Sequence, residues 1–141
     1  ASAALGMARG AIAGTIAHAT ATRFQHLDQS ISGYPTARAY IAQMQLKADL
    51  VAALLDQTLA ALEQPGDQTM LRVLEIKAAA GEAATEITDL AMRVCGGAAF
   101  RKEAGVERHF RDARANTVMA PTTDQLYDFI GRALCGIDLF A

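Results

Sequence analysis

The sequence predicts an all-α domain, arranged as an up-down-up-down four-helix bundle with a short extra helix before the last long one. The composition is 52% hydrophobic with no Trp and three Pro, which favours packed helices over a sheet rich in aromatic and β-branched residues. Apolar residues recur at steps of three and four, as in helices that pack nearly antiparallel. A chain of 141 residues can bury one hydrophobic core but not comfortably two. We therefore expect residues 1–141 to form one domain.

The first helix is expected from about Ser2 to Arg23. Its glycines, Gly6, Gly10 and Gly14, recur every four residues and so share one face of the helix. Each glycine costs about 1 kcal/mol of helix propensity relative to alanine. We expect a neighbouring backbone to approach this face closely and to compensate for that cost.

The second helix follows a polar, turn-like segment, Gln25 to Gly33, and has Pro35 in its first turn, where proline is favoured. It is expected to end at Pro65-Gly66. Its apolar seam steps by fours and threes, which is typical of a bundle helix. The seam comprises Ala37, Ile41, Met44, Ala48, Val51, Leu55, Thr58 and Leu62.

The third helix has Asp67 as its expected N-cap and ends at Gly96-Gly97. The tight turn before it predicts that the second and third helices form an antiparallel hairpin. Its seam repeats the spacing of the second helix and comprises Ile76, Ala80, Ala83, Ile87, Leu90 and Val94.

Two more helices complete the chain: a short one over Val106 to Ala115 and a last one from near Thr123 to Gly136. Thr122, Thr123 and Asp124 offer oxygen acceptors for the free amides of the last helix, and an acid there suits the helix dipole. The expected apolar face of that helix comprises Leu126, Phe129, Ile130, Ala133 and Leu134.

Charge is unevenly distributed, although the formal net charge is only −2. Residues 28–89 carry nine acids against four bases, whereas residues 93–114 carry six bases against three acids. The balance gives no case for a nucleic-acid partner. An ordinary solvated helix face with ion pairs would also explain the basic cluster, and we expect Asp112 to pair with a nearby guanidinium.

Neither a disulfide nor a metal site is predicted. Cys95 and Cys135 show no CxxC spacing and are interpreted as reduced thiols. The three histidines, His18, His26 and His109, lack partners at metal-ligand spacing. No Glu-x-x-His pair of the ferritin type is present.

The apolar N-terminal stretch, Ala1 to Ala17, is not typical of a signal peptide, because it has no basic leader and is interrupted by Arg9. No apolar run reaches the roughly 20 residues that span a bilayer. We therefore expect no membrane insertion and a cytoplasmic location. The chain begins without Met and already within a helical pattern, so we expect it to be a piece of a longer polypeptide.

Three sequence motifs carry the functional information: Arg93-Val94-Cys95-Gly96-Gly97-Ala98-Ala99-Phe100, then Val106 to Arg114 with Arg111-Asp112-Ala113-Arg114, then Met119-Ala120-Pro121-Thr122-Thr123. In this order they resemble the C-terminal signature of the flavin-dependent acyl-CoA dehydrogenase family. The resemblance covers nearly the whole chain as a helical domain, and its specific motifs lie between Arg93 and Gly136. The fold that it implies agrees with the helical bundle predicted above.

The resemblance implies FAD as the cofactor and a shared cofactor site. In the family the double-glycine loop, with a polar residue three positions before it, contacts FAD bound mainly to the partner subunit. Those positions match Gly96, Gly97 and Arg93, where the family more often has Gln. An arginine can hold phosphate or stack on adenine. A double glycine also has an ordinary explanation as a helix end.

Three further residues are assigned to cofactor binding by the resemblance. Thr122 matches a threonine that approaches the flavin, and Asp124 follows it at a helix N-terminus, which can bind anions. Arg23, before Phe24, loosely resembles an arginine that reaches FAD phosphates across a dimer, without the Phe-Gly that usually follows. A cation near the end of the first helix would equally suit the helix dipole.

The usual catalytic base of the family is missing. Its glutamate position is Ala120 here, and alanine cannot accept a proton. A subgroup of the family places the base on the first helix of this domain, at a position that would lie just before Ala1. No catalytic residue is assigned within the chain, and Asp124 is not assigned as one.

The function that the resemblance implies is α,β-dehydrogenation of acyl-CoA thioesters by an FAD-dependent oxidoreductase, of which this chain would complete the flavin site and the subunit interface. It further implies a homo-oligomer, dimer or tetramer, and an electron-transfer flavoprotein as possible electron acceptor. The chain alone is not expected to be active. Two alternatives stay open: a flavin-dependent monooxygenase of the same fold, and a non-catalytic helical oligomerisation module.

Overall fold

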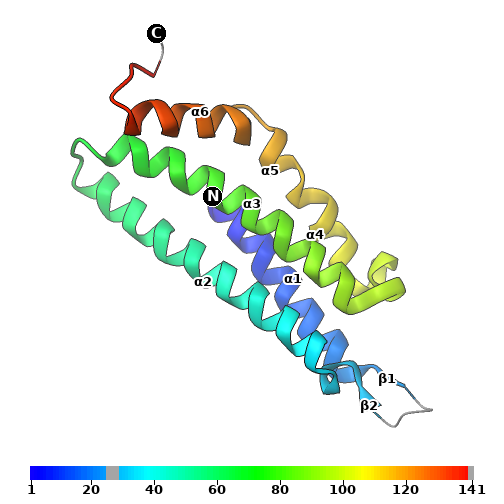
Figure 1. Cartoon of the computed structure of the whole chain (residues 1–141). Helices are drawn as coiled ribbons and strands as arrows, with labels where there is room; N and C mark the ends of the chain where they lie inside the picture. Colours follow the sequence, from blue (N-terminus) through cyan, green and yellow to red (C-terminus); the bar gives the residue numbers. More distant parts are fainter. Residues whose placement is uncertain (25–28, 140–141) are drawn as a thin grey trace.

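The structure is a computed structural model that describes residues 1–24 and 29–139. It confirms the all-α prediction (Figure 1). The helices of the described residues are α1 (Ser2–Ala21), α2 (Pro35–Glu63), α3 (Thr69–Cys95), α4 (Val106–Ala113), α5 (Ala115–Val118) and α6 (Thr123–Leu134).

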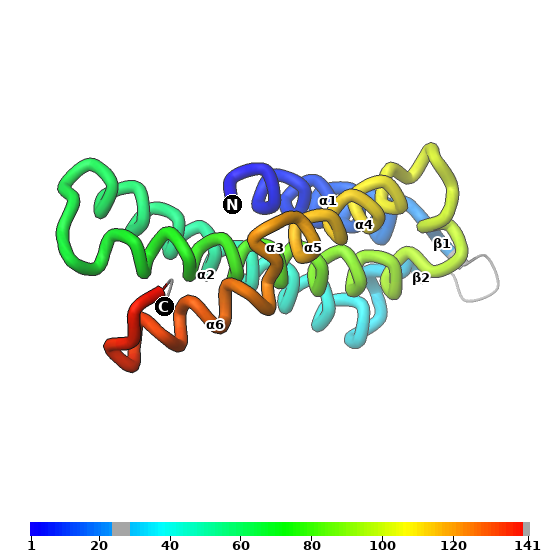
Figure 2. Tube along the Cα trace, turned by 90° about the horizontal axis from the view of Figure 1, so that it is seen from above, coloured from blue at the N-terminus to red at the C-terminus, as the bar shows by residue number. Residues whose placement is uncertain are grey.

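The helices alternate in direction along the chain. α1, α2 and α3 lie side by side, and α4, α5 and α6 then return along α3 as one broken path (Figures 1 and 2). α4 packs against both α1 and α3, whereas α6 packs against the N-terminal half of α3. α3 therefore contacts every other helix and forms the central support of the domain.

The hydrophobic core follows the predicted seams of α2 and α3. Met44 and Ile87 are fully buried, and Leu126 anchors α6 with 1% of its surface exposed. Two seam predictions are wrong: Leu62 is 51% exposed and Leu134 is 68% exposed. Both lie in the last turn of their helices, which end at Glu63 and Leu134, so the spacing continues to the helix end although these side chains remain exposed.

The glycine face of α1 is only partly used for close packing. A Cβ added at Gly10 would lie 2.8 Å from Nε2 of His109, so the α4 imidazole rests directly on the α1 backbone. A Cβ at Gly14 would make ordinary contacts with Ala104 and Val106, and one at Gly6 would meet nothing within 4 Å. The close approach at Gly10 is therefore made by a side chain and not by the predicted backbone, a neighbouring backbone is in ordinary contact only at Gly14, and nothing approaches Gly6.

The first helix ends two residues earlier than the sequence predicted, at Ala21 and not at Arg23. α1 ends at Ala21, because Thr22 has an extended backbone with φ −81° and ψ 121°. Strand β1 (Arg23–Phe24) then pairs antiparallel with β2 (Gln29–Ser30), and a 3-10 turn, η1 (Ile31–Gly33), precedes α2. Part of the predicted polar turn, including His26, lies outside the described residues.

Asp67 is not the N-cap of the third helix, which begins at Thr69 after Gln68. The hydroxyl of Thr69 organises this turn instead: it accepts from the Gly66 amide at 2.8 Å and donates to the Ala61 carbonyl at 3.1 Å. The side chain therefore bridges the end of α2 and the start of α3.

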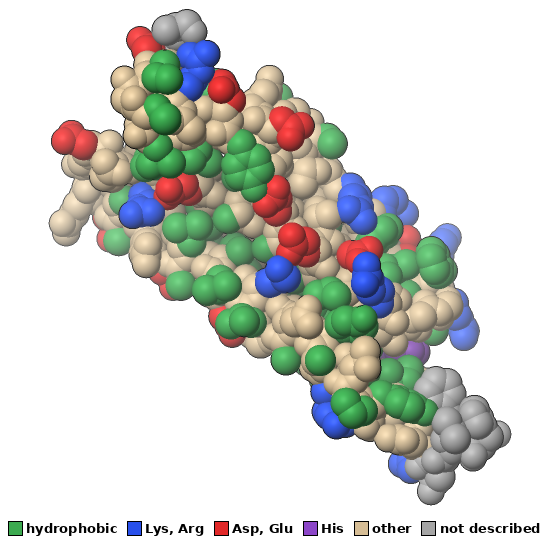
Figure 3. Space-filling model, viewed as in Figure 1, with side chains coloured by type: hydrophobic (Ala, Val, Ile, Leu, Met, Phe, Trp, Pro, Cys, Tyr) green, Lys and Arg blue, Asp and Glu red, His purple; other side chains and the backbone are tan. Residues whose placement is uncertain are grey.

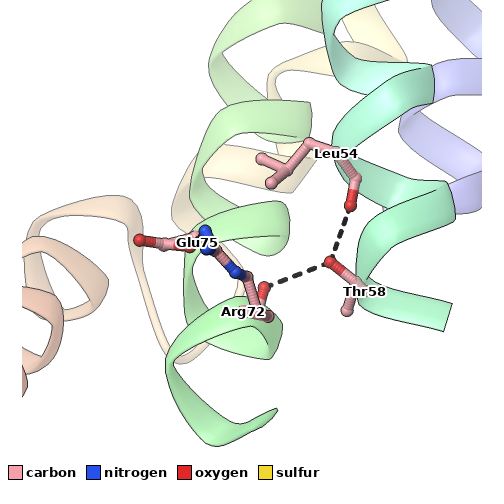
Figure 4. A network of polar contacts seen from close by, with 4 residues as sticks. All are labelled: Leu54, Thr58, Arg72 and Glu75. Carbon is pink, nitrogen blue, oxygen red and sulfur yellow. Dashed lines mark hydrogen bonds and ion pairs between the residues drawn. The ribbon is translucent and has the colours of Figure 1, made fainter. Parts of the chain in front are cut away.

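A buried threonine links the two arms of this hairpin (Figure 4). The Thr58 hydroxyl on α2 donates to the Leu54 carbonyl at 2.8 Å and lies 3.4 Å from the Arg72 carbonyl of α3. Arg72 in turn pairs with Glu75 at 2.8 Å. The predicted antiparallel hairpin of α2 and α3 is thus present and joined by polar contacts.

The short helix predicted over Val106 to Ala115 is divided into α4 and α5 at Arg114. It follows two 3-10 turns, η2 (Gly96–Phe100) and η3 (Lys102–Ala104), and Gly105, whose φ is +67°. Among the described residues no helix is long and apolar enough to cross a membrane.

Candidate functional site

The double glycine ends α3 and leaves its backbone uncovered. Gly96 has φ 56° and ψ −142°, a region that only glycine occupies without strain. A Cβ added at Gly96 or at Gly97 would meet nothing within 4 Å. Both glycines are exposed, so a bulky molecule can approach this backbone closely.

Arg93 lies one turn before the double glycine. Its Nε donates to Asp89 at 3.0 Å, yet the side chain remains 60% exposed. The Arg93 side chain lines a groove of about 380 Å³ between α2 and α3. Lys47 and Arg114 also line this groove. Lys47 pairs with Glu86 across this groove. Arg93, Gly96 and Gly97 together are called the glycine surface below.

The predicted basic cluster surrounds this end of α3. Arg114 lies over the Phe110 ring, 4.6 Å from its centroid, and Arg111 contacts both Asp112 and Glu107 at 3.4 and 3.5 Å. The expected pairing of Asp112 with a guanidinium is therefore present. Figure 3 shows Lys and Arg side chains gathered over α4 and the end of α3.

Arg23 is placed at the same end of the bundle as the glycine surface (Figures 1 and 2). A small apolar cluster joins Ala19 of α1, Ala37 of α2 and Val94 of α3. Arg23 itself belongs to β1, opposite Ser30, and therefore lies beyond the last turn of α1. The basic residue within the last turn of α1 is His18.

Thr122 and Asp124 lie elsewhere, at the start of α6. Thr122 is the N-cap: its hydroxyl accepts from the Gln125 amide at 3.4 Å, and its own amide donates to the Gln125 side chain at 2.9 Å. This reciprocal capping box satisfies two groups at the helix end. Asp124 is exposed in the first turn. The predicted helix start is confirmed.

The predicted residues thus form two groups, one at the glycine surface and one at the start of α6. The start of α6 contacts α3 far from the C-terminal end of α3, where the glycine surface lies. The Pro121 carbonyl accepts from Lys77 of α3 at 2.8 Å. Lys77 and Gly96 are 19 residues apart in sequence, which is roughly 28 Å at the helical rise of about 1.5 Å per residue. One flavin ring cannot contact both groups of the same chain.

A second pocket lies where the missing base would be expected. Its cavity volume is about 190 Å³, and Ala120 and Ala1 are both part of its wall. Ala120, which matches the usual base position, therefore borders the same pocket as Ala1, next to which the resemblance places the alternative base. The remaining lining residues are Ala4, Lys77, Gly81, Asn116 and Met119.

Sequence reasoning missed Lys77 and Gly81, which support this pocket. Lys77 donates to the Met119 and Pro121 carbonyls, and a Cβ at Gly81 would lie 3.5 Å from the Asn116 carbonyl oxygen. Their spacing of four places them on one face of α3, next to the seam residue Ile76. A lysine and a glycine four residues apart form no motif, so no signal in the sequence pointed to this contact.

The thiols and histidines that the structure describes do not gather into a further centre. Within residues 1–24 and 29–139, no three His, Cys, Asp or Glu side chains lie close enough to hold a metal ion. Burial raises the pKa of the Cys95 thiol, and its hydrogen bond with Thr15 only partly offsets this. Cys95 is buried and Cys135 is exposed, and both are free.

Comparison with known proteins agrees with the helical arrangement. Residues 1–135 match the model of the acyl-CoA dehydrogenase C-terminal domain. The chain is 33% identical over 129 residues to the mitochondrial short-chain specific acyl-CoA dehydrogenase of Bos taurus, covering 88% of this chain and 29% of the bovine protein.

Solved structures share the fold. A glutaryl-coenzyme A dehydrogenase in complex with glutaryl-CoA superposes with a TM-score of 0.86 at 24% identity, covering 96% of this chain and 34% of that one. The FAD complex of PigA gives 0.85 at 21% identity, covering 94% and 34%. The chain thus spans about a third of the length of these proteins. Its matched residues, fold and motifs together show that this chain belongs to the acyl-CoA dehydrogenase family, as a C-terminal domain.

Proposed function

We propose that residues 1–141 form one domain of an FAD-dependent acyl-CoA dehydrogenase-like oxidoreductase, in which the domain borders two flavins at once. The glycine surface would contact the FAD of a partner subunit, and the start of α6 would contact the FAD of its own subunit. The separation of roughly 28 Å between the two groups, derived from the helical rise, carries this proposal. A chain that served a single flavin would need its cofactor residues together.

The residues present suit FAD at both places. The Gly96 amide already donates to the Met92 carbonyl. The exposed backbone at Gly96 and Gly97 would nevertheless let a pyrophosphate approach closely, and the partly exposed Arg93 guanidinium beside it offers donors. The α6 N-terminus offers amides and the positive end of a helix dipole. FAD would supply the acceptor for the hydride. Arg23, at the same end as the glycine surface, is proposed to bind the partner's FAD as well.

The substrate is proposed to be an acyl-CoA thioester whose reacting carbons lie at the pocket beside Ala120. Because Ala120 cannot accept a proton, we propose that the base comes from the position preceding Ala1 in the longer polypeptide. The supporting observation is that Ala1 and Ala120 border one pocket. Replacement of Ala120 by Glu would place a carboxylate at the same pocket.

The proposal also includes the oligomeric state, the electron acceptor and the location of the protein. A shared site requires a homo-oligomer, either a dimer or a tetramer, and an electron-transfer flavoprotein is the proposed electron acceptor. The cytoplasmic location stays a prediction, since the bovine relative carries a mitochondrial name. The subunit interface would lie beside the glycine surface.

The first test uses the full-length protein that contains this chain. It should purify with bound flavin, and the flavin absorbance should bleach when acyl-CoA is added without oxygen. A colourless protein that cannot be reconstituted with FAD would favour the oligomerisation module. Rapid reoxidation by oxygen, accompanied by hydroxylated substrate, would favour the monooxygenase.

The shared site is tested by mixing two variants, each with one added carboxylate. Gly97→Asp should weaken FAD binding at the partner's site, and Thr122→Asp should weaken it at the chain's own site while keeping an N-cap, because aspartate is a good cap. Each homo-oligomer should lose flavin. Oligomers mixed from both variants contain sites with two intact halves and should regain flavin. No recovery in mixed oligomers would exclude sharing between subunits.

A further inference from the structure

Lys77 reaches from α3 to the connection between α5 and α6. Its Nζ donates to the Pro121 carbonyl at 2.8 Å and to the Met119 carbonyl at 3.3 Å. These two carbonyls flank Ala120, and Pro121 directly precedes the N-cap Thr122. A single ammonium group therefore holds both sides of the turn Met119–Thr122, which we call the α6 turn.

A need for helix stability does not explain this arrangement. The N-terminus of α6 is the positive end of a helix dipole, where a cation is unfavourable. Within residues 1–24 and 29–139, Lys77 also makes no ion pair with an acid. Its charge is instead met by backbone carbonyls, and an ammonium carries three donors, of which these two bonds use two.

A second contact beside Lys77 brings the backbone of α5 onto α3. A Cβ added at Gly81 would lie 3.5 Å from both Cβ and the carbonyl oxygen of Asn116. The Asn116 side chain donates to the Ala113 carbonyl at 3.1 Å. α5 is thus seated on α3 just before the α6 turn, and Lys77 fixes the direction in which the turn leaves.

Lys77 also borders the pocket shared by Ala1, Ala4 and Ala120. The orientation of the α6 turn decides where the free amides of α6 point and how the backbone of residue 120 faces this pocket. A displacement of about 1 Å can cost roughly a hundredfold in rate. The hydrogen bonds from Lys77 restrain the α6 turn, and the proposed reaction requires this turn to keep a fixed position.

We infer that Lys77 is a positioning residue for the proposed flavin chemistry: it orients the α6 turn toward the pocket beside Ala120. This inference rests on the proposed function. Its structural part, that Lys77 restrains the turn, can be measured without any reaction.

The kinetic experiment compares Lys77→Met, Lys77→Arg and the control Lys102→Met in the flavin-loaded full-length protein. Lys77→Met should lower the rate of anaerobic flavin bleaching by acyl-CoA about tenfold or more, with the half-saturating acyl-CoA concentration changed less than about twofold, since binding groups are untouched. Lys77→Arg retains donors and should recover most of the rate. Lys102 is exposed in η3, and its variant should match the wild type.

Hydrogen exchange on the same proteins supplies the reading that does not depend on activity. Lys77→Met should speed amide exchange in residues 122–126 several-fold, whereas Lys102→Met should not. Lys77→Gln, which keeps a neutral donor, replaces the methionine variant if that variant does not fold. Unchanged exchange and an unchanged bleaching rate would overturn the inference. Faster exchange in a protein whose wild type is not bleached would support the restraint and refute the proposed dehydrogenation.

Discussion

The two ends of the candidate site are built in different ways. The glycine surface is local: Arg93 pairs with Asp89 four residues away, and Gly96 ends the helix by its own backbone conformation. The α6 turn depends on distant residues: Lys77 is 44 residues from Pro121, and Gly81 meets Asn116. Both ends rest on α3, which connects them.

This difference explains which end could be found from the sequence. A local surface appears as a motif of adjacent residues, so the double glycine and its arginine were visible at once. When a surface is assembled from segments distant in sequence, only its local part can be recognised as a motif. At the α6 turn that part is the Thr122 cap. The restraint from α3 needs the fold before it can be recognised.

The variant with the largest expected effect tests whether the glycine surface and the α6 turn unfold together because both pack on α3. Ile87 is fully buried and lies on α3 between Lys77 and Gly96. Ile87→Ala should lower the free energy of unfolding by about 2–5 kcal/mol, because it leaves a cavity in the core. Urea unfolding measures the loss, and hydrogen exchange follows residues 93–100 and 117–126 separately.

Ile87→Val is the matched control and should cost only about 0.5–1.5 kcal/mol. Exchange should accelerate at both ends in Ile87→Ala if α3 supports them together. Acceleration at only one end would separate the two regions and contradict the role of α3 as their shared support.

A smaller effect should be confined to the glycine surface. Gly96→Ala forces a side chain into a backbone region that glycine alone adopts easily, and should cost about 1–3 kcal/mol. Gly97 is not among the positive-φ glycines, and its added Cβ would meet nothing within 4 Å. Gly97→Ala should therefore unfold at nearly the wild-type urea concentration. Equal losses in the two variants would argue against strain at Gly96.

The α6 turn should respond to loss of its cap by about 1 kcal/mol. Thr122→Ala removes the hydroxyl that accepts the Gln125 amide, and such losses range over about 0.5–2 kcal/mol. Thr117→Ala is the control: that exposed hydroxyl only donates to the Arg114 carbonyl at 3.0 Å. Thermal unfolding of both variants measures the difference, and no difference between them would show that the capping box contributes nothing.

The same division between local and distant contacts runs through the whole fold. The helices, the seams of α2 and α3, the double-glycine end and the Thr122 cap were predicted because each depends on residues within a few positions. Asp67 was wrongly chosen as a cap because the Thr69 hydroxyl bonds back to α2, outside its own helix. Leu62 and Leu134 followed a correct spacing, yet both lie in the last turn of a helix and remain exposed. Lys77 has no motif of its own.

The smallest effect concerns Tyr127, which ties α6 to α3 beyond the α6 turn. Its hydroxyl bonds to the Glu82 carboxylate, and this bond, with burial and the charges of Glu82 and Glu86, raises the pKa of Tyr127 to about 12. The phenol of an unfolded chain titrates near about 10. Because the folded pKa is the higher one, the contribution to stability is complete below about pH 10 and is lost as the pH rises through about 12.

Absorbance titration near 295 nm should therefore show a tyrosine step near pH 12 that disappears in Tyr127→Phe. Glu82→Gln should move that step toward about pH 10, because it removes the carboxylate that opposes ionisation. At neutral pH, Tyr127→Phe should change the free energy of unfolding by no more than about 0.5 kcal/mol, as is usual for exposed sites. A step that stays in place in Glu82→Gln would show that the Glu82 carboxylate does not hold the Tyr127 hydroxyl, and the attachment of α6 to α3 would then depend more strongly on the buried Leu126 and on Lys77.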